Sequence, residues 1–395
     1  MTTSASDRLE DVLVQGDANP IALDLGPGYL GEALLPTQSV ANAYATVLAD
    51  LPRAALGYGP ELGPRPAREA VAALRGVDSD AIMMTAGISG MLDVIACANR
   101  SHGGTILVEA VSYDLANAVF RDHGYKIART RPEESDPVRA LAQALELHRA
   151  STAFIYLTPT LGNPTGRTMS IEQRNAVIEL AQRFDVQIIE DDAYADHVEE
   201  ADRPLSLAEL GSGLETRDHQ PLVIGLGSGS KVLGAGLRVG WLMAPPEWLH
   251  EFSSRGQFRS GGCANQIAAL VLAHLVANGD YSRQARRVRH VLAERATAFR
   301  TGIAETSEGL LTPSQHWAGG LFDWIDAPNP TAIERGGELE GIRVYAGTRF
   351  GEDSRGHLRV AYGTVSAKEA HEAGRRIGAL STNPSTTTTT FLEDQ

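Results

Sequence analysis

Residues 225–241 read GLGSGSKVLGAGLRVGW, a glycine-rich run that overlaps the end of the apolar stretch PLVIGL at 221–226. A P-loop needs glycine directly before its lysine and Ser or Thr directly after it, whereas Ser230 and Val232 occupy those places. A dinucleotide-binding fingerprint fails at Ser230 too, because that position must hold its third glycine. Two common phosphate-binding loops are therefore excluded.

A nucleophile elbow centred on Ser228 does not fit either, because Leu226 and Ser230 stand where that turn needs glycine. What remains is Lys231, with the hydroxyls of Ser228 and Ser230 shortly before it and Arg238 seven residues after it. Two hydroxyls and a guanidinium would suit a phosphate dianion held beside a lysine amine. Taken alone, the run is equally compatible with a glycine loop that carries a solvated lysine.

Short apolar runs alternate with helical patterns through most of the chain. Fully apolar strands separated by helices indicate a mostly parallel sheet that is covered on both faces. Six candidate strands carry this pattern, at 81–85, 105–109, 153–158, 186–190, 221–226 and 238–244. Beyond about residue 263 the pattern turns helical and then gives three more candidate strands, at 319–327, 342–347 and 357–363.

This order predicts a large α/β domain followed by a smaller α+β domain. The tail STNPSTTTTTFLEDQ is of low complexity and cannot bury much apolar area, so we expect it to be disordered. We expect residues 21–50 to pack at the small domain and the active-site entrance. The predicted divisions are a flexible segment at 1–20, a large domain at 21–280, a small domain at 281–380 and a tail at 381–395.

The composition narrows the class of partner. The 395 residues include 35 Lys and Arg against 49 Asp and Glu, which gives a net charge of −14. Such a surface repels polyphosphates, so we expect neither nucleic acid nor membrane as a partner. Two cysteines offer no disulfide framework, and we predict no metal site. Without an apolar span or a leader-like beginning, we expect a cytoplasmic protein.

Polar motifs follow several of the predicted strands, at the position where ligands bind in open α/β sheets. NPTG at 163–166 follows one strand, DDAY at 191–194 follows another, and Tyr113 follows a third. One strand-to-helix turn offers free backbone N–H groups, which suit a phosphate, at Gly87, Ile88 and Ser89.

Together these motifs resemble those of the class I/II aminotransferases, a family of fold-type I enzymes that depend on pyridoxal 5′-phosphate. NPTG, D-x-A-Y, S-x-S-K-x-x-x-x-G-L-R-x-G-W and an arginine on a late strand occur in the family's order, over roughly residues 20–375. Asn163, Asp191, Lys231 and Arg359 lie 28, 40 and 128 residues apart, which is similar to the family's spacing. The resemblance implies the fold-type I architecture: a mostly parallel sheet with helices on both faces in the large domain, plus a smaller α+β domain.

The resemblance also implies roles for the residues around the cofactor. Lys231 would form the internal aldimine and later move protons on the substrate. Asp191 would pair with the pyridine nitrogen and favour its charged form. Asn163 and Tyr194 would hydrogen-bond the ring's 3′-oxygen, with Tyr194 counted among the catalytic residues, and Tyr113 would stack on the ring.

The cofactor's phosphate would be held by the backbone at 87–89 and by the side chains of Ser228, Ser230 and Arg238. Tyr58, in GYGPELG at 57–63, resembles the family tyrosine that reaches the phosphate bound by the neighbouring subunit. This resemblance predicts a homodimer.

The substrate, an α-amino acid as a free small molecule, would be bound by Arg359, whose guanidinium suits two parallel hydrogen bonds to an α-carboxylate. Asn163, Gly28 and Tyr29 would complete the substrate site, because the segment around Gly28 closes over the substrate in the family. His197 is the histidine nearest to the predicted site, and the sequence leaves its role open.

The implied function is an aminotransferase of amino acid metabolism or biosynthesis, which acts on an α-amino acid and a 2-oxo acid through internal and external aldimines. Gly229, Ala235 and the segment GPGYLGEALLP at 26–36 depart from the family pattern and leave an alternative. In this alternative, the quinonoid intermediate that the substrate and cofactor form in such enzymes would lead to another outcome: β/γ-elimination or replacement, cyclisation, C–C bond formation or oxidation. An S-adenosylmethionine-like or arginine-like substrate is an example. A third reading is an aminotransferase-like regulatory domain. The acidic charge and the mere 20 or so residues before the domain disfavour it.

Overall fold

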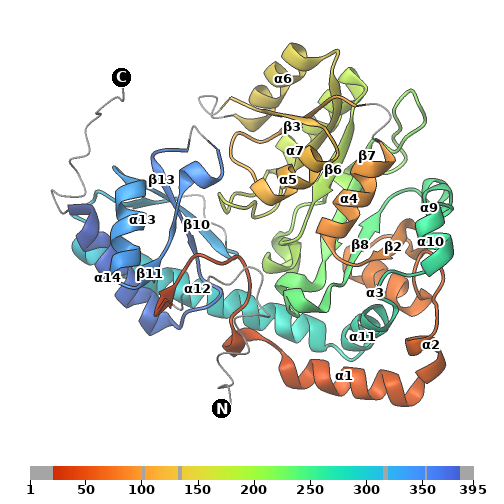
Figure 1. Ribbon diagram of the computed structural model, residues 1–395, viewed down its shortest axis with the longest axis horizontal. Coiled ribbons are helices and arrows are strands. Elements are labelled where there is room, and N and C mark those ends of the chain that lie inside the picture. Colours follow the sequence, from red (N-terminus) through yellow and green to blue (C-terminus); the bar gives the residue numbers. More distant parts are fainter. Residues whose placement is uncertain (1–20, 100–102, 132–135, 315–318, 352–353, 383–395) are drawn as a thin grey trace, which may run out of the picture. The chain divides into compact units, whose positions relative to one another are not determined.

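The computed structural model describes residues 21–99, 103–131, 136–314, 319–351 and 354–382. The chain separates into two compact units, which we call the large unit and the small unit. The large unit comprises residues 34–290 and 316–320, and the small unit comprises 1–33, 291–315 and 321–395, each in its described part. Helix α12 (Asp280–Thr306) continues from one unit into the other (Figure 1). The domain boundaries expected from the sequence stay a prediction.

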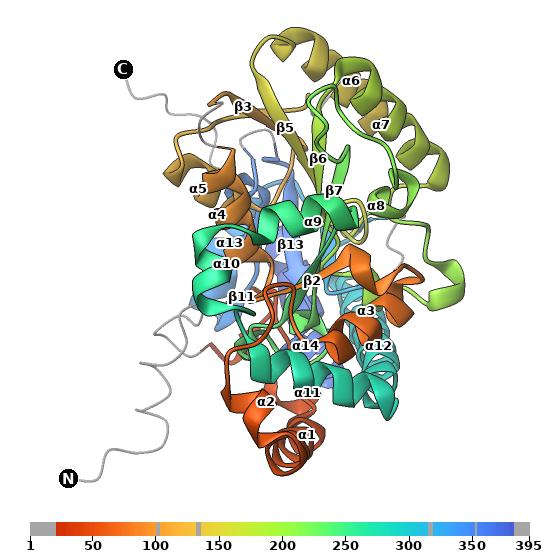
Figure 2. The same ribbon diagram turned by 90° about the vertical axis from the view of Figure 1, so that its right-hand side faces the viewer.

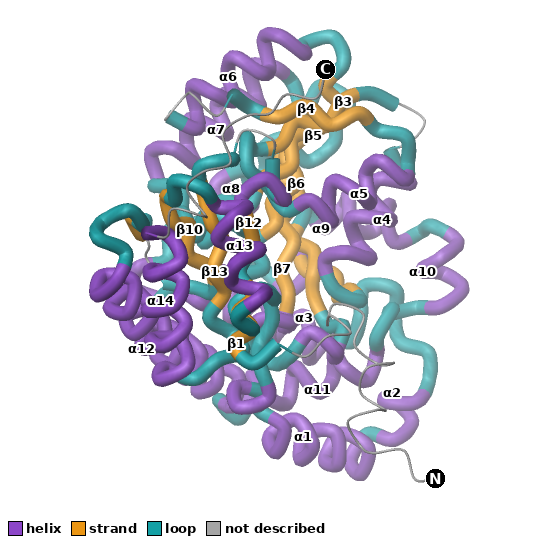
Figure 3. The backbone as a smooth tube through the Cα atoms, turned by 60° about the vertical axis from the view of Figure 1, so that its left-hand side comes forward, coloured by secondary structure: helices purple, strands orange, loops and turns teal. Residues whose placement is uncertain are grey.

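A seven-stranded sheet, in the order β2-β8-β7-β6-β5-β3-β4, forms the centre of the large unit. The strands from β7 to β4 run parallel to one another, whereas β8 is antiparallel to both of its neighbours. Figure 3 shows β7, β6, β5, β3 and β4 side by side. The mostly parallel sheet confirms the prediction. Its strands are β2 (Ile82–Thr85), β3 (Thr105–Val108), β4 (Lys126–Arg129), β5 (Thr152–Leu157), β6 (Gln187–Asp191), β7 (Val223–Ser228) and β8 (Gly240–Met243).

Helices cover both faces of this sheet, because successive strand residues point to opposite sides. Ile106 and Val108 of β3 pack with α4 and α5, while Leu107 between them packs with α6 and α7. Figure 2 shows the α4–α5 pair and the α6–α7 pair on opposite sides of the sheet. The helices of the large unit that precede α12 are α1 (Thr37–Asp50), α2 (Pro52–Leu56), α3 (Arg65–Arg75), α4 (Ile88–Ala98), α5 (Asp114–Asp122), α6 (Pro137–His148), α7 (Ile171–Phe184), α8 (Leu207–Leu210), α9 (Pro246–Ser253), α10 (Gly256–Gly261) and α11 (Gln266–Ala277).

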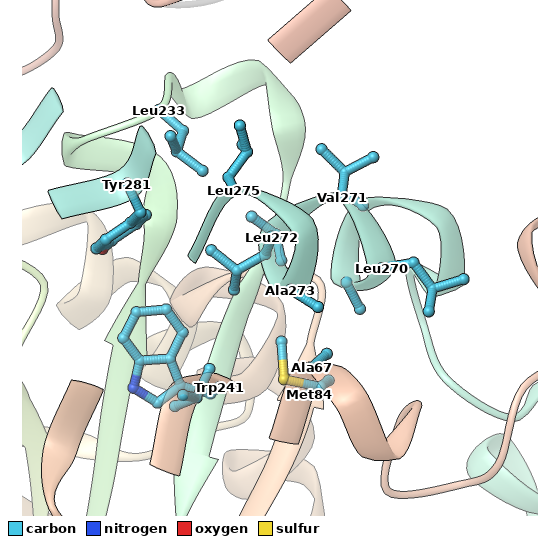
Figure 4. Packing of buried hydrophobic residues seen from close by; sticks show 14 of the residues in the cluster. Ala67, Met84, Leu233, Trp241, Leu270, Val271, Leu272, Ala273, Leu275 and Tyr281 are labelled. Atoms are coloured by element: carbon cyan, nitrogen blue, oxygen red, sulfur yellow. The ribbon is translucent and has the colours of Figure 1, made fainter. Parts of the chain in front are cut away.

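A third apolar cluster lies between α11, α3 and the strands β2 and β8. Trp241 of β8 is fully buried in it, together with Leu272 and Leu275 of α11. Figure 4 shows Leu233, two residues beyond Lys231, beside Leu275. The chain that leaves Lys231 is therefore fixed in a packed core.

The small unit contains a four-stranded antiparallel sheet in the order β12-β13-β10-β9, and β1 pairs in parallel with β11. This α+β arrangement also confirms the predicted fold class. Across the described residues of both units, no helix combines the length and apolarity that crossing a bilayer requires. The elements of the small unit besides α12 are β1 (Leu23–Asp24), β9 (Thr312–Pro313), β10 (Phe322–Asp326), α13 (Pro330–Leu339), β11 (Ile342–Arg343), β12 (Tyr345–Ala346), β13 (His357–Ala361) and α14 (Ala367–Thr382).

Two leucines on α6 test the packing of the sheet. Leu145 is fully buried in the cluster beneath α6 and α7, whereas Leu147 is 71% exposed. We expect Leu145→Ala to lower the free energy of unfolding by about 2–5 kcal/mol, because it leaves a cavity. The control Leu147→Ala should change it by less than about 0.5 kcal/mol. Urea unfolding of both variants measures this, and equal effects would contradict the assigned face of α6.

Candidate functional site

A buried carboxylate ends strand β6. Asp191 is only 7% exposed, and its Oδ2 accepts a hydrogen bond from the Tyr156 hydroxyl at 2.7 Å. Its Oδ1 accepts the backbone N–H of Ala193 at 3.2 Å. Burial raises the pKa of Asp191 to about 6, although both hydrogen bonds act in the opposite direction. A buried carboxylate of this kind gains most from a cationic partner, and a protonated pyridine nitrogen fits that need.

Tyr156, which lies on β5, is not among the site residues predicted from the sequence. Burial, and after it the negative charge of Asp191, raise the pKa of this phenol well above its usual range. Tyr156 therefore stays a neutral hydrogen-bond donor. The available signal was a tyrosine inside the otherwise apolar run AFIYLT, because a buried phenol needs a partner for its hydroxyl.

The predicted lysine follows the neighbouring strand. β7 continues into the 3-10 helix η6 (Gly229–Lys231), and β6 and β7 are paired in parallel with Asp191 opposite Leu226. Both strands thus end at the same edge of the sheet. Lys231 is half-buried, and its Nζ lies 5.5 Å from the centroid of the Tyr194 ring. Its charge also lowers the pKa of Asp191, so the amine and the carboxylate lie within electrostatic range.

The polar and aromatic residues expected around a ring are all in this unit. Tyr194 and Asn163 are buried, and Asn163 precedes a cis proline. Tyr113 precedes α5 and packs, partly buried, against the apolar cluster that contains Tyr156. Tyr113 and Tyr194 both act electrostatically on the Tyr156 hydroxyl. Tyr156 is therefore the common neighbour of three predicted site residues, namely Tyr113, Tyr194 and Asp191.

Two hydroxyls precede Lys231, as the sequence predicts. The Ser228 side chain accepts the backbone N–H of Ser230 at 3.1 Å and so caps η6. The Ser228 hydroxyl also donates to the Ser230 oxygen at 2.8 Å. Both side chains are buried. Paired hydroxyls at the start of a helical turn are suited to an anion.

Arg238 lies beside the N-terminus of α4. Its Nη2 donates to the carbonyl of Ala86 at 3.0 Å, and its Nη1 donates to the carbonyl of Ala235 at 3.1 Å. Gly87, which precedes α4, has a φ of 91°, and a Cβ there would collide with the Arg238 guanidinium. Glycine is therefore required twice over at this turn, for its backbone conformation and for the close approach of Arg238.

The start of α4 presents two further predicted residues. Ile88 is buried, whereas Ser89 is exposed, and both lie in the first turn of the helix. The first N–H groups of a helix have no partner within it and carry part of the helix dipole. With Arg238 alongside, this turn has the donors and the positive charge that a phosphate needs.

These residues together fit a phosphorylated pyridine aldehyde. The large unit offers an amine for the aldehyde, a buried carboxylate for the ring nitrogen, aromatic side chains for the ring faces and an anion-binding turn for the phosphate. Pairing of Thr85 with Gly240 between β2 and β8 brings the α4 turn and the Arg238 loop to one sheet end.

The predicted carboxylate-binding arginine lies in the small unit. Arg359 is paired with Trp324 of β10 and with Tyr345 of β12, and it is 5% exposed. Its guanidinium lies 4.7–5.1 Å from the centroids of three rings, and its Nη2 donates to the carbonyl of Gly26. Such cation–π contacts fix the plane of a guanidinium. The rings are those of Phe322, Tyr345 and Phe350.

The other residues predicted for the site, Gly28, Tyr29 and Tyr58, differ in their surroundings and exposure. Gly28 lies against Phe322, where a Cβ would come within 2.9 Å of the ring. Tyr29 is half-buried, and burial followed by the nearby Asp24 raises its pKa. Tyr58 lies in the large unit beyond α2 and is 90% exposed. The Tyr58 ring is therefore open to solvent.

Comparison with known proteins places the chain in a family. The model of the family "Aminotransferase class I and II" matches residues 21–377. The 2-aminoadipate transaminase of Thermus thermophilus is 30% identical over 366 residues, which cover 91% of this chain and 90% of that protein. An uncharacterised HTH-type transcriptional regulator of Bacillus subtilis, YisV, is 28% identical over 94% of this chain and 78% of its own length.

The fold is similar to that of a solved enzyme. The structure of LysN, an α-aminoadipate aminotransferase from Thermus thermophilus complexed with N-(5′-phosphopyridoxyl)-L-leucine, gives a TM-score of 0.79. The match has 27% identity and covers 96% of this chain and 98% of that one. With a family model spanning most of its length, the chain belongs to the class I and II aminotransferases and is a pyridoxal phosphate-dependent aminotransferase.

Proposed function

We propose that Lys231 and Asp191 are the catalytic centre of this aminotransferase, with pyridoxal 5′-phosphate attached to Lys231. The observation that carries the proposal is the buried Asp191 carboxylate on β6, beside the strand β7 that continues into η6 and its last residue, Lys231. When bound, the cofactor supplies an electron-withdrawing ring that stabilises negative charge at the substrate's Cα.

The residues of the chain would perform five tasks in this proposal. Asp191 keeps a proton on the ring nitrogen, and Tyr156 keeps Asp191 in place. Lys231 would take the proton from the substrate's Cα and deliver it to the aldehyde carbon (C4′) of the cofactor. Tyr194 and Asn163 would hydrogen-bond the 3′-oxygen of the ring, while Tyr113 would cover one ring face.

The phosphate would be held by backbone N–H groups at the start of α4 and by three side chains. The support for this part is the Arg238 guanidinium at the Gly87 turn and the buried hydroxyl pair of Ser228 and Ser230. Charged hydrogen bonds to a phosphate are worth about 1.5–3 kcal/mol each, so these groups would contribute most of the cofactor's non-covalent affinity.

Arg359 would bind the α-carboxylate of the substrate, and Gly28, Tyr29 and Asn163 would be further substrate-binding residues. Its burial among three rings supports this role, because a fixed guanidinium can make two parallel hydrogen bonds at little entropic cost. A pocket with this charge can bind an anion although the chain carries a net charge of −14. The name of the Thermus relative makes 2-aminoadipate the first amino donor to test.

We propose further that the enzyme acts in the cytoplasm as a homodimer, in which Tyr58 contacts the phosphate bound by the neighbouring subunit. A tyrosine that is 90% exposed next to Leu56, itself 75% exposed, supports an interface at this loop.

Spectral titration tests the proposed function directly. Holoenzyme mixed with an amino donor and no acceptor should convert to the pyridoxamine form, and a 2-oxo acid should reverse the change. Lys231→Ala should slow the conversion by about 10²–10⁴-fold, because it removes the proton-transferring amine. Borohydride reduction followed by peptide mapping should place the cofactor on Lys231 in the wild type.

The donor panel should include 2-aminoadipate, leucine, arginine and S-adenosylmethionine. If the cofactor returns as pyridoxal in every turnover without a 2-oxo acid, the alternative outcomes of elimination, cyclisation or oxidation replace transamination. A cofactor mapped to another lysine would contradict the proposal itself.

The hydrogen bond of Tyr156 predicts a pH-dependent affinity. Tyr156→Phe removes a bond that lowers the pKa of Asp191, so that pKa rises above about 6 and less carboxylate is ionised near neutral pH. The Kd of pyridoxal phosphate should rise about tenfold or more at pH 6.5. The ratio of the variant's Kd to the wild type's should shrink at pH 8.5, where both carboxyls are ionised.

Tyr125→Phe is the matched control for this experiment. It deletes the same oxygen from another buried tyrosine, whose hydroxyl donates to the carbonyl of Ala96. The control should leave the Kd unchanged at both pH values. An equal effect of the two variants, or a ratio that is constant with pH, would show that Tyr156 does not act on Asp191.

Mixed dimers test the role of Tyr58. Lys231→Ala and Tyr58→Phe chains, unfolded and refolded together, should regain activity at a cofactor concentration that leaves Tyr58→Phe dimers largely unloaded. Half of the dimers would be mixed and would hold one intact site, so about a quarter of the wild-type activity is expected. Lys231→Ala mixed with Asp191→Asn is the control and should regain none, since both residues serve the same site. No recovery in the first mixture would refute the shared site.

A further inference from the structure

A buried histidine links the segment after β6 to the main chain of Lys231. His197 closes the 3-10 helix η4 (Ala195–His197) and is 3% exposed. Its Nε2 lies 2.8 Å from the carbonyl oxygen of Lys231. A carbonyl can only accept a hydrogen bond, so Nε2 carries the proton and donates it.

The surroundings of His197 keep its ring neutral. Its Nδ1 is buried and has no hydrogen-bond partner among the described residues, so a proton there would be unpaired. Burial lowers the pKa of His197 to about 4. Of the charged groups that face it, Asp196 raises this pKa, whereas Lys231 and Arg289 lower it. The ring is thus a fixed donor near neutral pH and no carrier of protons.

The segment that holds His197 is itself fastened at the preceding residue. Asp196 accepts two hydrogen bonds from Arg75 of α3, at 2.9 and 2.7 Å, and one from the Tyr281 hydroxyl of α12 at 2.6 Å. Arg289 donates to the backbone carbonyl of Asp196 at 3.0 Å. Arg75 is 5% exposed and lies over the buried Trp241 ring at 5.0 Å. Figure 4 shows Tyr281 in the same packed core as Trp241.

The main-chain carbonyls of Lys231 and of the residue after it obtain their hydrogen bonds from side chains. At the end of a short helix the last carbonyls lack partners within the helix. His197 satisfies the carbonyl of Lys231, and Gln284 donates to the next one, that of Val232, at 3.2 Å. The His197 ring also meets the Tyr194 ring edge-on at 6.1 Å, and Tyr194 is the ring that the Lys231 amine faces.

We propose that His197 is a positioning residue, which fixes the main chain of Lys231 and with it the direction of the catalytic amine. The inference rests on the proposed function of Lys231. It explains why an imidazole is buried where its second nitrogen has no hydrogen-bond partner among the described residues: a neutral ring donates to the carbonyl with one nitrogen and contacts the Tyr194 ring edge-on. Loss of the donor frees the Lys231 backbone, and misplacement of a reacting group by about 1 Å can cost about 10²-fold in rate.

Three substitutions at this position test the inference on the holoenzyme. His197→Gln places an amide N–H near the position of Nε2, whereas His197→Asn is polar but too short to reach the carbonyl. His197→Leu fills the space without a donor. His250→Leu, which alters an exposed histidine of α9, is the matched control.

The main measurement is the pH titration of the visible absorption of the bound cofactor. The Asn and Leu variants should shift its midpoint by about half a pH unit or more and lower kcat about 10–100-fold, with KM changed less than about threefold. The Gln variant and the control should keep the wild-type midpoint and a kcat within about threefold. The contrast between Gln and Asn keeps the test decisive even if the Leu variant fails to fold.

Wild-type midpoints in the Asn and Leu variants would overturn the inference, as would a Gln variant that behaves like the Asn variant. Borohydride mapping on the same samples separates this failure from that of the proposed function. If the cofactor maps to Lys231 in every variant while the midpoints do not move, only the role of His197 is refuted. A cofactor on another lysine refutes the proposed function and this inference with it.

Discussion

The arrangement of the large unit depends on a negative charge placed where water does not reach. A carboxylate that is 7% exposed is costly unless a cation or several donors compensate it. Tyr156 and the backbone N–H of Ala193 supply part of that compensation, yet burial still holds the pKa of Asp191 near 6. The site is therefore built to favour a bound cation, and a ring nitrogen that becomes positive on protonation meets this demand.

The sheet brings other site residues of the large unit to the end where Asp191 lies, because its parallel strands have their carboxyl ends on the same side. Asp191 ends β6, and η6 with Lys231 follows β7 in the neighbouring position. Strand β8 runs antiparallel to β2 and β7, so its first residue lies at the end of the sheet where those two strands end. Arg238, which comes shortly before β8, therefore lies next to the turn that follows β2. The same end of the sheet thus brings together an amine, a carboxylate and a turn whose N–H groups and neighbouring arginine suit an anion. Ligands of open α/β folds generally bind at this end of the sheet.

Much of the architecture and the site could be predicted from the sequence, since the informative residues are contiguous: a lysine between serines and an arginine, or an acid closing an apolar run. Contacts between distant segments could not. Tyr156 on β5 hydrogen-bonds Asp191 on the neighbouring strand β6, and His197 hydrogen-bonds a carbonyl that lies 34 residues further along the chain. Strand β4 escaped prediction because KIAR lies at the sheet edge, where Lys126 is exposed and no apolar run forms. The cage of rings around Arg359 also depends on strand pairing that no local pattern shows.

The central claim is that buried Asp191 holds the cofactor's ring nitrogen in its protonated form. The ¹⁵N NMR shift of ring-labelled pyridoxal phosphate bound to the enzyme measures this state directly. At pH 8 the wild type should show a protonated pyridine nitrogen, because Asp191 is then ionised and the charge pair is buried. Asp191→Asn, with the cofactor still bound, should show a neutral one. A neutral ring nitrogen in the wild type, or the same shift in both proteins, would contradict the account.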